Sequence, residues 1–217
     1  MQVYLVPGLA SDRRIFCKLA LPAHEMKVLE LPEMQFGATI KEHASLLSRS
    51  VGKERHMLIG MSMGGMIMQE MAAITRPDLV IIISSWKSAD EMPIWIKQLR
   101  GTHPERIVSK KFIDRVLPLL YWQMGAENDE DRVLIDEFAR GTPIEKIKMQ
   151  MNACLNWNGP ELAPARLIHI HGDNDHLMPI GSIKGAIPVK DGGHFMVFNK
   201  ADRISEMIRN ELSRIGI

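Results

Sequence analysis

Five consecutive aliphatic residues, Leu-Val-Ile-Ile-Ile at 79–83, constrain the fold of this chain most strongly. A strand with one face in water alternates apolar and polar residues, so a continuous run predicts a strand that is buried on both faces. Other short apolar runs lie at 3–6, 27–31, 57–61, 167–170 and 187–190. Because helical patterns separate them, we expect an α/β fold: a mostly parallel, open sheet of about six strands with helices on both faces.

Two segments between these runs carry clear signals for helices. Thr39 and Glu42 form a capping box, in which the hydroxyl and the carboxylate satisfy free backbone N–H groups at a helix start. A second helix is expected to begin near Met63 and to end before Pro77, because proline cannot continue a helix. Its positions that are expected to be buried are Ile67, Met71 and Ile74.

The segment 87–164 interrupts the alternation of strands and helices. It has helical patterns throughout, including a second capping box from Thr142 to Glu145, and it contains three of the four tryptophans: Trp95, Trp122 and Trp157. We interpret it as a helical cap inserted into a core that consists of 1–86 and 165–217. The alternative is an ordinary helical segment of one compact domain.

Composition and charge exclude several classes of partner. The 27 basic and 26 acidic side chains give a formal charge of +1, which provides no electrostatic footprint for nucleic acid or for an anionic membrane. No apolar segment approaches the roughly 20 residues of a membrane span. Cys17 and Cys154 are too few for a disulfide framework and lack metal-ligand spacing. With no leader-like N-terminus, we expect a soluble, cytoplasmic protein.

The most informative motif is Gly60-Met61-Ser62-Met63-Gly64, followed by Gly65. It lies directly after an apolar strand and directly before an amphipathic helix, the context in which Gly-x-Ser-x-Gly presents a nucleophilic serine. The glycines let neighbouring backbone pass closely, and the helix N-terminus favours developing negative charge. The spacing does not fit a dinucleotide fingerprint, and Met66 stands where a phosphate-binding loop needs lysine.

A nucleophilic serine needs a base, and the base needs an orienting acid. Asp175 follows the strand at 167–170, and His194 follows the weaker strand at 187–190. Because parallel strands end at the same edge of a sheet, the serine, the acid and the histidine are all expected at that edge.

These three motifs together resemble the α/β-hydrolase superfamily, over nearly the whole chain. The resemblance implies that Ser62 is the nucleophile, His194 the general base and then acid, and Asp175 the residue that orients the histidine. It also implies an oxyanion hole formed by the backbone N–H groups of Leu9 and Met63. The sequence departs from the family pattern in two ways. Pro7 stands where an early His-Gly turn has histidine, and the family's two leading strands are expected to be absent.

Two other carboxylates compete with Asp175 for the role of the acid. Asp173 lies two residues earlier and could instead satisfy N–H groups of its own turn, as aspartate commonly does in loops. Asp90 follows the strand at 79–83, where some members of the resembling family place the acid. Asp175 fits best because Pro179 follows it at the spacing of the family.

Several other groups of residues allow a second interpretation. The segment 169–176, with His169, His171, Asp173, Asp175 and His176, could hold zinc or iron, although packed histidines leading into the acid loop explain it better. The five methionines near the serine are expected to fill the core, with an adaptable wall for an acyl group as the alternative. These are Met61, Met63, Met66, Met68 and Met71.

Charged and ionisable residues outside the motifs are assigned to the surface. Arg13 and Arg14 could bind a substrate carboxylate, but a solvated loop is the simpler interpretation. Four histidines are expected at the surface or in loops: His24, His43, His56 and His103.

The sequence therefore predicts a serine hydrolase that cleaves a carboxylic ester or thioester of a small to medium, largely uncharged acyl compound. The tryptophans of the cap, Trp95, Trp122 and Trp157, are expected to line the substrate pocket. No metal or organic cofactor is implied, and the oligomeric state stays open. The alternatives are a non-catalytic ligand-binding protein and a cofactor-free lyase on the same fold.

Overall fold

A parallel sheet forms the centre of the computed structural model, which describes residues 1–21 and 25–216. Within these residues, six strands pair in the order β2-β1-β3-β4-β5-β6, and every pair is parallel. The strands are β1 (Gln2–Val6), β2 (Glu25–Val28), β3 (His56–Met61), β4 (Leu79–Ile83), β5 (Leu167–Gly172) and β6 (Ile187–Val189). The sheet is open, with β2 and β6 at its edges, so the predicted fold class is confirmed.

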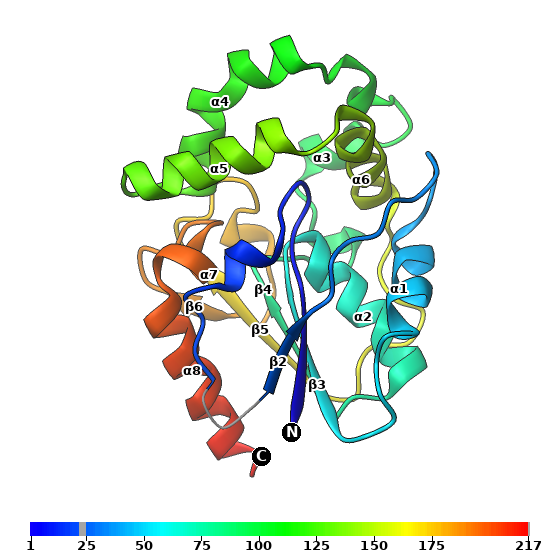
Figure 1. Cartoon of the computed structure of the whole chain (residues 1–217), viewed down its shortest axis with the longest axis vertical. Coiled ribbons are helices and arrows are strands. Elements are labelled where there is room, and N and C mark those ends of the chain that lie inside the picture. The colour runs from blue at the N-terminus through cyan, green and yellow to red at the C-terminus, as the bar shows by residue number, and fades with distance from the viewer. Residues whose placement is uncertain (22–24, 217) are drawn as a thin grey trace.

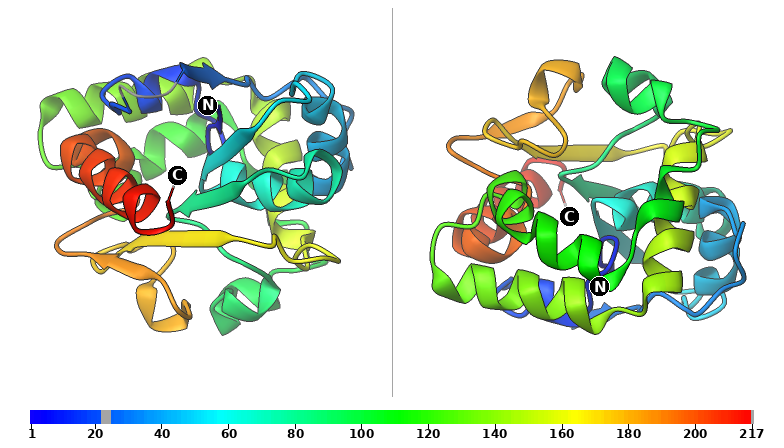
Figure 2. Two further views of the ribbon diagram at one scale, coloured as in Figure 1. Left: turned by 90° about the horizontal axis from the view of Figure 1, so that it is seen from below. Right: turned by 90° about the horizontal axis from the view of Figure 1, so that it is seen from above.

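Helices cover both faces of this sheet, as the two end-on views in Figure 2 show. The α-helices are α1 (Ile40–Ser48), α2 (Met63–Thr75), α3 (Ile94–Gln98), α4 (Lys110–Met124), α5 (Asp129–Gly141), α6 (Ile144–Asn156), α7 (Met196–Asn199) and α8 (Ala201–Arg214). The short 3₁₀ segments are η1 (Arg13–Phe16), η2 (Ala89–Glu91), η3 (Pro104–Ile107) and η4 (Ile180–Ser182).

The pleat of the central strand β4 divides the core into two layers. Ile81 packs in the cluster that contains Ile204 and Ile208 of α8. Val80 and Ile82 point to the other face, into the cluster built from α1 and α2. All five residues of β4 are buried, as the continuous apolar run predicts.

The start of α1 confirms the first capping box. The Thr39 hydroxyl accepts a hydrogen bond from the Glu42 backbone N–H at 3.2 Å, and the Glu42 carboxylate accepts one from the Thr39 N–H at 2.7 Å. Helix α2 begins at Met63 and ends at Thr75, as expected. Ile74 was expected to be buried, but it is 54% exposed, because burial along α2 ends at Ala72 and the last turn projects into solvent.

Two boundaries differ from the sequence prediction. The strand predicted at 27–31 runs from Glu25 to Val28, and its side chains are mostly exposed because it lies at the sheet edge. The apolar residues Leu29 and Leu31 are buried in the loop that follows the strand. The apolar residues at 29 and 31 therefore indicate where the chain returns to the core after the strand, and not the strand itself.

The second capping box, from Thr142 to Glu145, is wrong. Pro143 occupies the N-cap position of α6, without a hydrogen bond from a capping side chain. The Thr142 hydroxyl instead donates to the carbonyl oxygen of Ala10, 3.4 Å away. A tertiary contact to a distant turn thus replaces the local cap.

The surface assignment of the histidines is also wrong in part. His43 and His56 are buried, and each uses its Nδ1 atom to hydrogen-bond a nearby backbone carbonyl oxygen, of Thr39 and Glu54 respectively. His103 is partly exposed and contacts Glu105. His24 lies outside the described residues. A hydrogen bond to a nearby backbone carbonyl allows an imidazole to be buried. The hydrophobic periodicity of the sequence does not predict such a bond.

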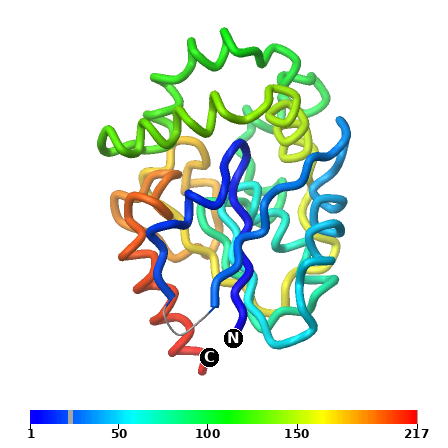
Figure 3. The backbone as a smooth tube through the Cα atoms, viewed as in Figure 1, coloured from blue at the N-terminus to red at the C-terminus, as the bar shows by residue number. Residues whose placement is uncertain are grey.

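The segment 87–164 contains helices and 3₁₀ turns and lies beyond the carboxyl ends of the strands (Figure 1). The start of β1 and the end of α8 lie together at the opposite end of the sheet (Figure 3). The division into a core of 1–86 and 165–217 and a cap of 87–164 stays a prediction. Among the described residues, none of the helices combines the length and apolarity that crossing a bilayer requires.

Replacing Ile81 by alanine should lower the free energy of unfolding by about 2–5 kcal/mol, because the truncation leaves a cavity in the centre of the sheet. Ile74→Ala, at the exposed end of α2, is the matched control and should change it by less than about 1 kcal/mol. Urea unfolding followed by circular dichroism measures both. Equal effects of the two substitutions would contradict the assignment of β4 to the core.

Candidate active site

Ser62 occupies a strained turn between β3 and α2. Its backbone angles are φ 55° and ψ −122°, outside the regions that non-glycine residues usually adopt. The Ser62 N–H donates to the carbonyl oxygen of Ile83 at 2.9 Å, and the Ser85 hydroxyl donates to the Ser62 carbonyl oxygen at 2.7 Å. Residues at the end of β4 therefore hold the turn, and the strand–turn–helix context predicted for Ser62 is confirmed.

Glycines 60 and 64 allow the turn to be this tight. A Cβ atom on Gly60 would lie 2.3 Å from the carbonyl oxygen of Gly64. One on Gly64 would lie 2.1 Å from the carbonyl oxygen of Val6, in the neighbouring strand β1. Since both obstacles are backbone atoms that cannot move aside, the spacing of the two glycines is a steric requirement.

Three side chains from different strand ends meet in a hydrogen-bonded chain. His194 Nε2 lies 3.0 Å from Ser62 Oγ, and His194 Nδ1 lies 2.8 Å from Asp175 Oδ2. All three residues are at least nine-tenths buried. An imidazole that donates from Nδ1 to a carboxylate has Nε2 free to accept the proton of the hydroxyl. This is the arrangement that activates a serine as a nucleophile.

Asp175 is the only one of the three candidate acids that contacts His194 in the described part of the chain. Its Oδ1 atom accepts the backbone N–H groups of Leu177 at 3.0 Å and Met178 at 2.7 Å. Burial acts to raise the pKa of this carboxyl, but His194, the Met178 N–H and His171 together hold it below its usual value. Asp173 and Asp90 are both exposed.

His169 and His171 lie behind the acid loop, on one face of β5. The His171 Nε2 atom donates to the carbonyl oxygen of Met178 at 2.7 Å, which leaves Nδ1 to accept from His169 Nε2 at 3.2 Å. Burial, first of all, lowers the pKa of both residues, that of His169 to about 3, so both are neutral. The preferred interpretation from sequence, packed histidines leading into the acid loop, is confirmed, but it missed that His171 anchors the loop of Asp175.

No group of three or more histidine, cysteine or acidic side chains in the described residues could hold a metal ion. In the segment 169–176, His169 and His171 contact each other, and Asp173 is exposed. The metal interpretation therefore has no ligand set there.

The two expected oxyanion donors lie on either side of Ser62. Met63 is the first residue of α2, so its N–H has no acceptor within the helix. Leu9 follows Gly8, where an added Cβ atom would lie 3.1 Å from Ser62 Cβ, so the turn after β1 passes directly beside the serine. Among the described residues, the Leu9 N–H makes no hydrogen bond. The role of both groups stays a prediction.

Comparison with known proteins gives similarity in structure but not in sequence. No protein-family model matches the chain, and no curated protein matches it in sequence. A thermophilic esterase from Thermogutta terrifontis is similar in structure, with a TM-score of 0.73 and 18% identity over 99% of this chain and 90% of that one. A lipase-esterase related protein from Clostridium acetobutylicum gives 0.72 and 16% identity over 96% and 93%. The chain has the α/β-hydrolase fold.

The α/β-hydrolase fold does not fix the reaction. A bromoperoxidase from Bacillus anthracis is similar at a TM-score of 0.69 and 17% identity, over 98% of this chain and 91% of that one. Esterases and a bromoperoxidase thus share this architecture, and the identities are low. Function has to be inferred from the residues of the site.

The three tryptophans of the segment 87–164 occupy different environments in this α/β-hydrolase fold. Trp122 is 57% exposed and stacks on His176, the neighbour of Asp175, with ring centroids 4.2 Å apart. Trp95 is 52% exposed. Trp157 is buried, and its indole N–H donates to Glu70 at 2.8 Å. The structure does not gather the three at Ser62, and their contact with substrate stays a prediction.

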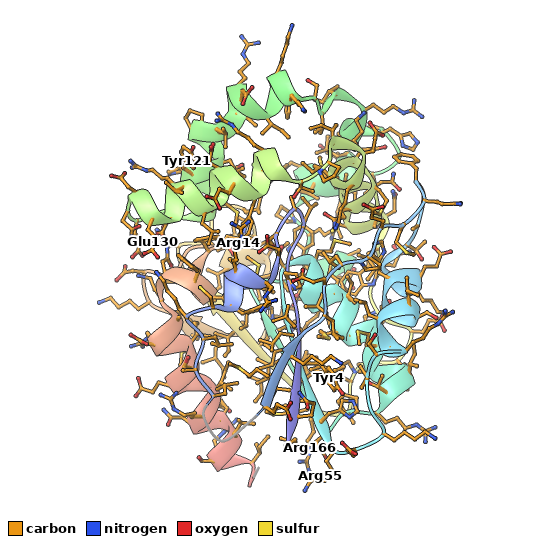
Figure 4. The ribbon with its side chains drawn as sticks, in the orientation of Figure 1. Tyr4, Arg14, Arg55, Tyr121, Glu130 and Arg166 are labelled. Atoms are coloured by element: carbon orange, nitrogen blue, oxygen red, sulfur yellow. The ribbon has the colours of Figure 1, made fainter. Side chains whose placement is uncertain are left out.

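The remaining sequence assignments concern the methionines and the arginine pair. Met61, Met63, Met66, Met68 and Met71 are all buried, so their expected role in the core is confirmed. Arg14 pairs with Asp12 and Glu137, where η1 meets α5 (Figure 4). Because Arg14 already pairs with these two partly exposed carboxylates of the same chain, binding of a substrate carboxylate there has no support from the contacts.

The neutral state of His169 should appear in the pH dependence of stability. Its pKa of about 3 lies below the usual value of about 6.5. Between these two pH values, His169 is protonated in the unfolded chain but neutral in the folded protein. Stability should therefore fall as the pH drops from about 6.5 toward about 3, by up to about 1.4 kcal/mol per pH unit for this group. The stability of the His169→Gln variant should fall less steeply over the same pH range, which urea unfolding at a series of pH values measures. Parallel curves would contradict the burial of a neutral imidazole.

Proposed function

We propose that this protein is a serine hydrolase that cleaves a carboxylic ester or thioester of a small to medium, largely uncharged acyl substrate. The observation that carries the proposal is the buried chain from Asp175 through His194 to Ser62, with contacts of 2.8 and 3.0 Å. The positive φ of Ser62 and its place at the N-terminus of α2 also support this function.

In the proposed reaction, Ser62 Oγ attacks the carbonyl carbon of the substrate while its proton passes to His194 Nε2. The carbon becomes tetrahedral and its oxygen takes the negative charge. His194 then gives the proton to the departing alkoxide or thiolate, and the acyl group stays on Ser62. A water molecule then attacks the acyl carbon and gives a proton to His194 Nε2, and His194 returns this proton to Ser62 Oγ as the acid is released.

Asp175 stays ionised through both steps. It holds the Nδ1 proton of His194, which fixes the tautomer, and it stabilises the imidazolium that forms when Nε2 is protonated. The depressed pKa of Asp175 keeps the carboxylate charged across the neutral range.

The backbone N–H groups of Leu9 and Met63 are proposed to bind the oxyanion. They flank Ser62 from the turn after β1 and from the start of α2. Donors placed before the reaction begins cost no reorganisation, and one such donor contributes about 3–4 kcal/mol to stabilising the transition state. Because both donors are backbone groups, the absence of a histidine at Pro7 does not remove them.

The segment 87–164 is proposed to act as a cap that selects the acyl group. It lies beyond the carboxyl ends of the strands, the edge at which Ser62 lies (Figure 1). Trp122, stacked on His176 next to Asp175, is the tryptophan that best supports this role. Its ring brings an apolar surface from α4 close to the acid loop.

Ser62→Ala should lower kcat for acyl esters by a factor of about 10⁴ or more and abolish covalent labelling by a fluorophosphonate probe, because the attacking oxygen is lost. The measurements are ester hydrolysis and gel-based labelling, with circular dichroism to verify folding. Ser50→Ala, at an exposed position, is the matched control and should leave both unchanged. Undiminished turnover in Ser62→Ala contradicts the proposal. Absence of labelling in the wild type would favour a ligand-binding protein.

Asp175→Asn should lower kcat by about 10⁴, since an amide at that position favours the wrong tautomer of His194. Asp173→Asn is its matched control two residues away, exposed and without contact to His194 in the described structure, and should retain kcat within about threefold of wild type. Initial rates on the same ester decide between them. The reverse order of effects would transfer the role of the acid to Asp173.

A further inference from the structure

The turn that carries the proposed oxyanion donor of Leu9 is strained. The Ser11 hydroxyl and N–H both donate to the Gly8 carbonyl oxygen, which closes the turn. Within it, Ala10 has φ 53°, in the left-handed region that costs a residue with a side chain roughly 1–2 kcal/mol. A turn of this kind keeps its shape only when neighbouring groups hold it.

Two residues of the segment 87–164 hold Ala10 from the side opposite to the sheet. The Gln150 Oε1 atom accepts the Ala10 N–H at 2.9 Å, and the Thr142 hydroxyl donates to the Ala10 carbonyl oxygen at 3.4 Å. Leu9 and Ala10 also pack against an apolar cluster of this segment that includes Ile147. The turn is therefore held by Gln150 of α6 and by Thr142, which lies just before α6 begins.

The side-chain amide of Gln150 uses its oxygen in a hydrogen bond but not its nitrogen. The side chain is fully buried, and its Nε2 atom has no hydrogen-bond partner among the described residues. The bond to the Ala10 N–H requires an acceptor and so fixes which end of the amide is oxygen. A buried N–H group without a partner costs about 1–3 kcal/mol, so an acceptor supplied by a ligand would recover that energy. Because both atoms are bonded to the same carbon, Nε2 lies close to Oε1 and therefore close to the Ala10 N–H.

We propose that Gln150 is a positioning residue that holds the oxyanion turn through Ala10, and that its free Nε2 donates to an acceptor oxygen on the acyl chain of the substrate. This inference rests on the proposed function and narrows its substrate class. Acyl groups with an oxygen close to the scissile carbonyl are preferred over plain alkanoyl groups.

Gln150→Met tests the positioning role, because methionine keeps the volume and removes both polar ends. With p-nitrophenyl butyrate, kcat should fall about 10- to 100-fold while KM stays within about threefold, since a displaced oxyanion donor affects the transition state rather than binding. Asn152→Leu, two residues along the same helix and without contact to the turn, is the matched control and should leave kcat unchanged. An unchanged kcat in folded Gln150→Met overturns the positioning role.

The donor role is tested with two substrates of equal shape. p-Nitrophenyl methoxyacetate carries an ether oxygen where p-nitrophenyl butyrate has a methylene group. The ratio of kcat/KM for the methoxyacetate over the butyrate should be about tenfold higher in wild type than in Gln150→Met, because intrinsic reactivity cancels in the comparison. Equal ratios in the two proteins overturn the donor role.

A second variant covers the case in which Gln150→Met does not fold. Gln150→Glu regains both an acceptor and a donor only when its carboxyl is protonated, and burial raises the pKa of such a group. With p-nitrophenyl methoxyacetate, its kcat/KM relative to wild type should rise about tenfold between about pH 8 and about pH 5, because only the protonated carboxyl donates. A ratio that does not change with pH overturns the donor role, since the ionised carboxylate still accepts the Ala10 N–H. Ser62→Ala in the same assay tests the proposed function separately, because labelling of wild type and not of Ser62→Ala supports that function whatever Gln150 does.

Discussion

The geometry of the site depends on the turn that holds Ser62 at φ 55°. Such backbone strain costs of order 1–3 kcal/mol and persists only where the surroundings enforce it. Here the surroundings are the carbonyl oxygen of Ile83, the hydroxyl of Ser85 and the absence of a side chain at Gly60 and Gly64. Since β3 is buried between β1 and β4, the sheet fixes the position of the turn, and the hydroxyl has a defined direction toward His194.

The acid is fixed by a second set of buried contacts. Asp175 accepts two N–H groups of its own loop, and His171 holds the carbonyl oxygen of Met178 in that loop. Two neutral imidazoles on β5 therefore support the carboxylate without adding positive charge that would compete with His194. The hydrogen-bonded chain is thus supported from β4 at the serine and from β5 at the aspartate.

Sequence patterns predicted what local spacing and strand order determine. The buried run at 79–83, the glycine spacing around Ser62 and the strand-end positions of Asp175 and His194 were sufficient for the fold and for the hydrogen-bonded chain. They failed where a distant partner decides. Thr142 has the sequence pattern of a helix cap, but its hydroxyl donates instead to the carbonyl oxygen of Ala10, 132 residues away in the sequence.

The central claim is that Ser62 becomes acylated during turnover. The most direct measurement is acid quenching of the enzyme during hydrolysis of p-nitrophenyl butyrate, followed by mass spectrometry of its peptides. We expect the mass of a butyryl group on the peptide that contains Ser62, because the proposed function assigns the nucleophile to the oxygen that His194 contacts. Steady turnover with the butyryl group on another residue, or turnover that persists in Ser62→Ala, would contradict the account.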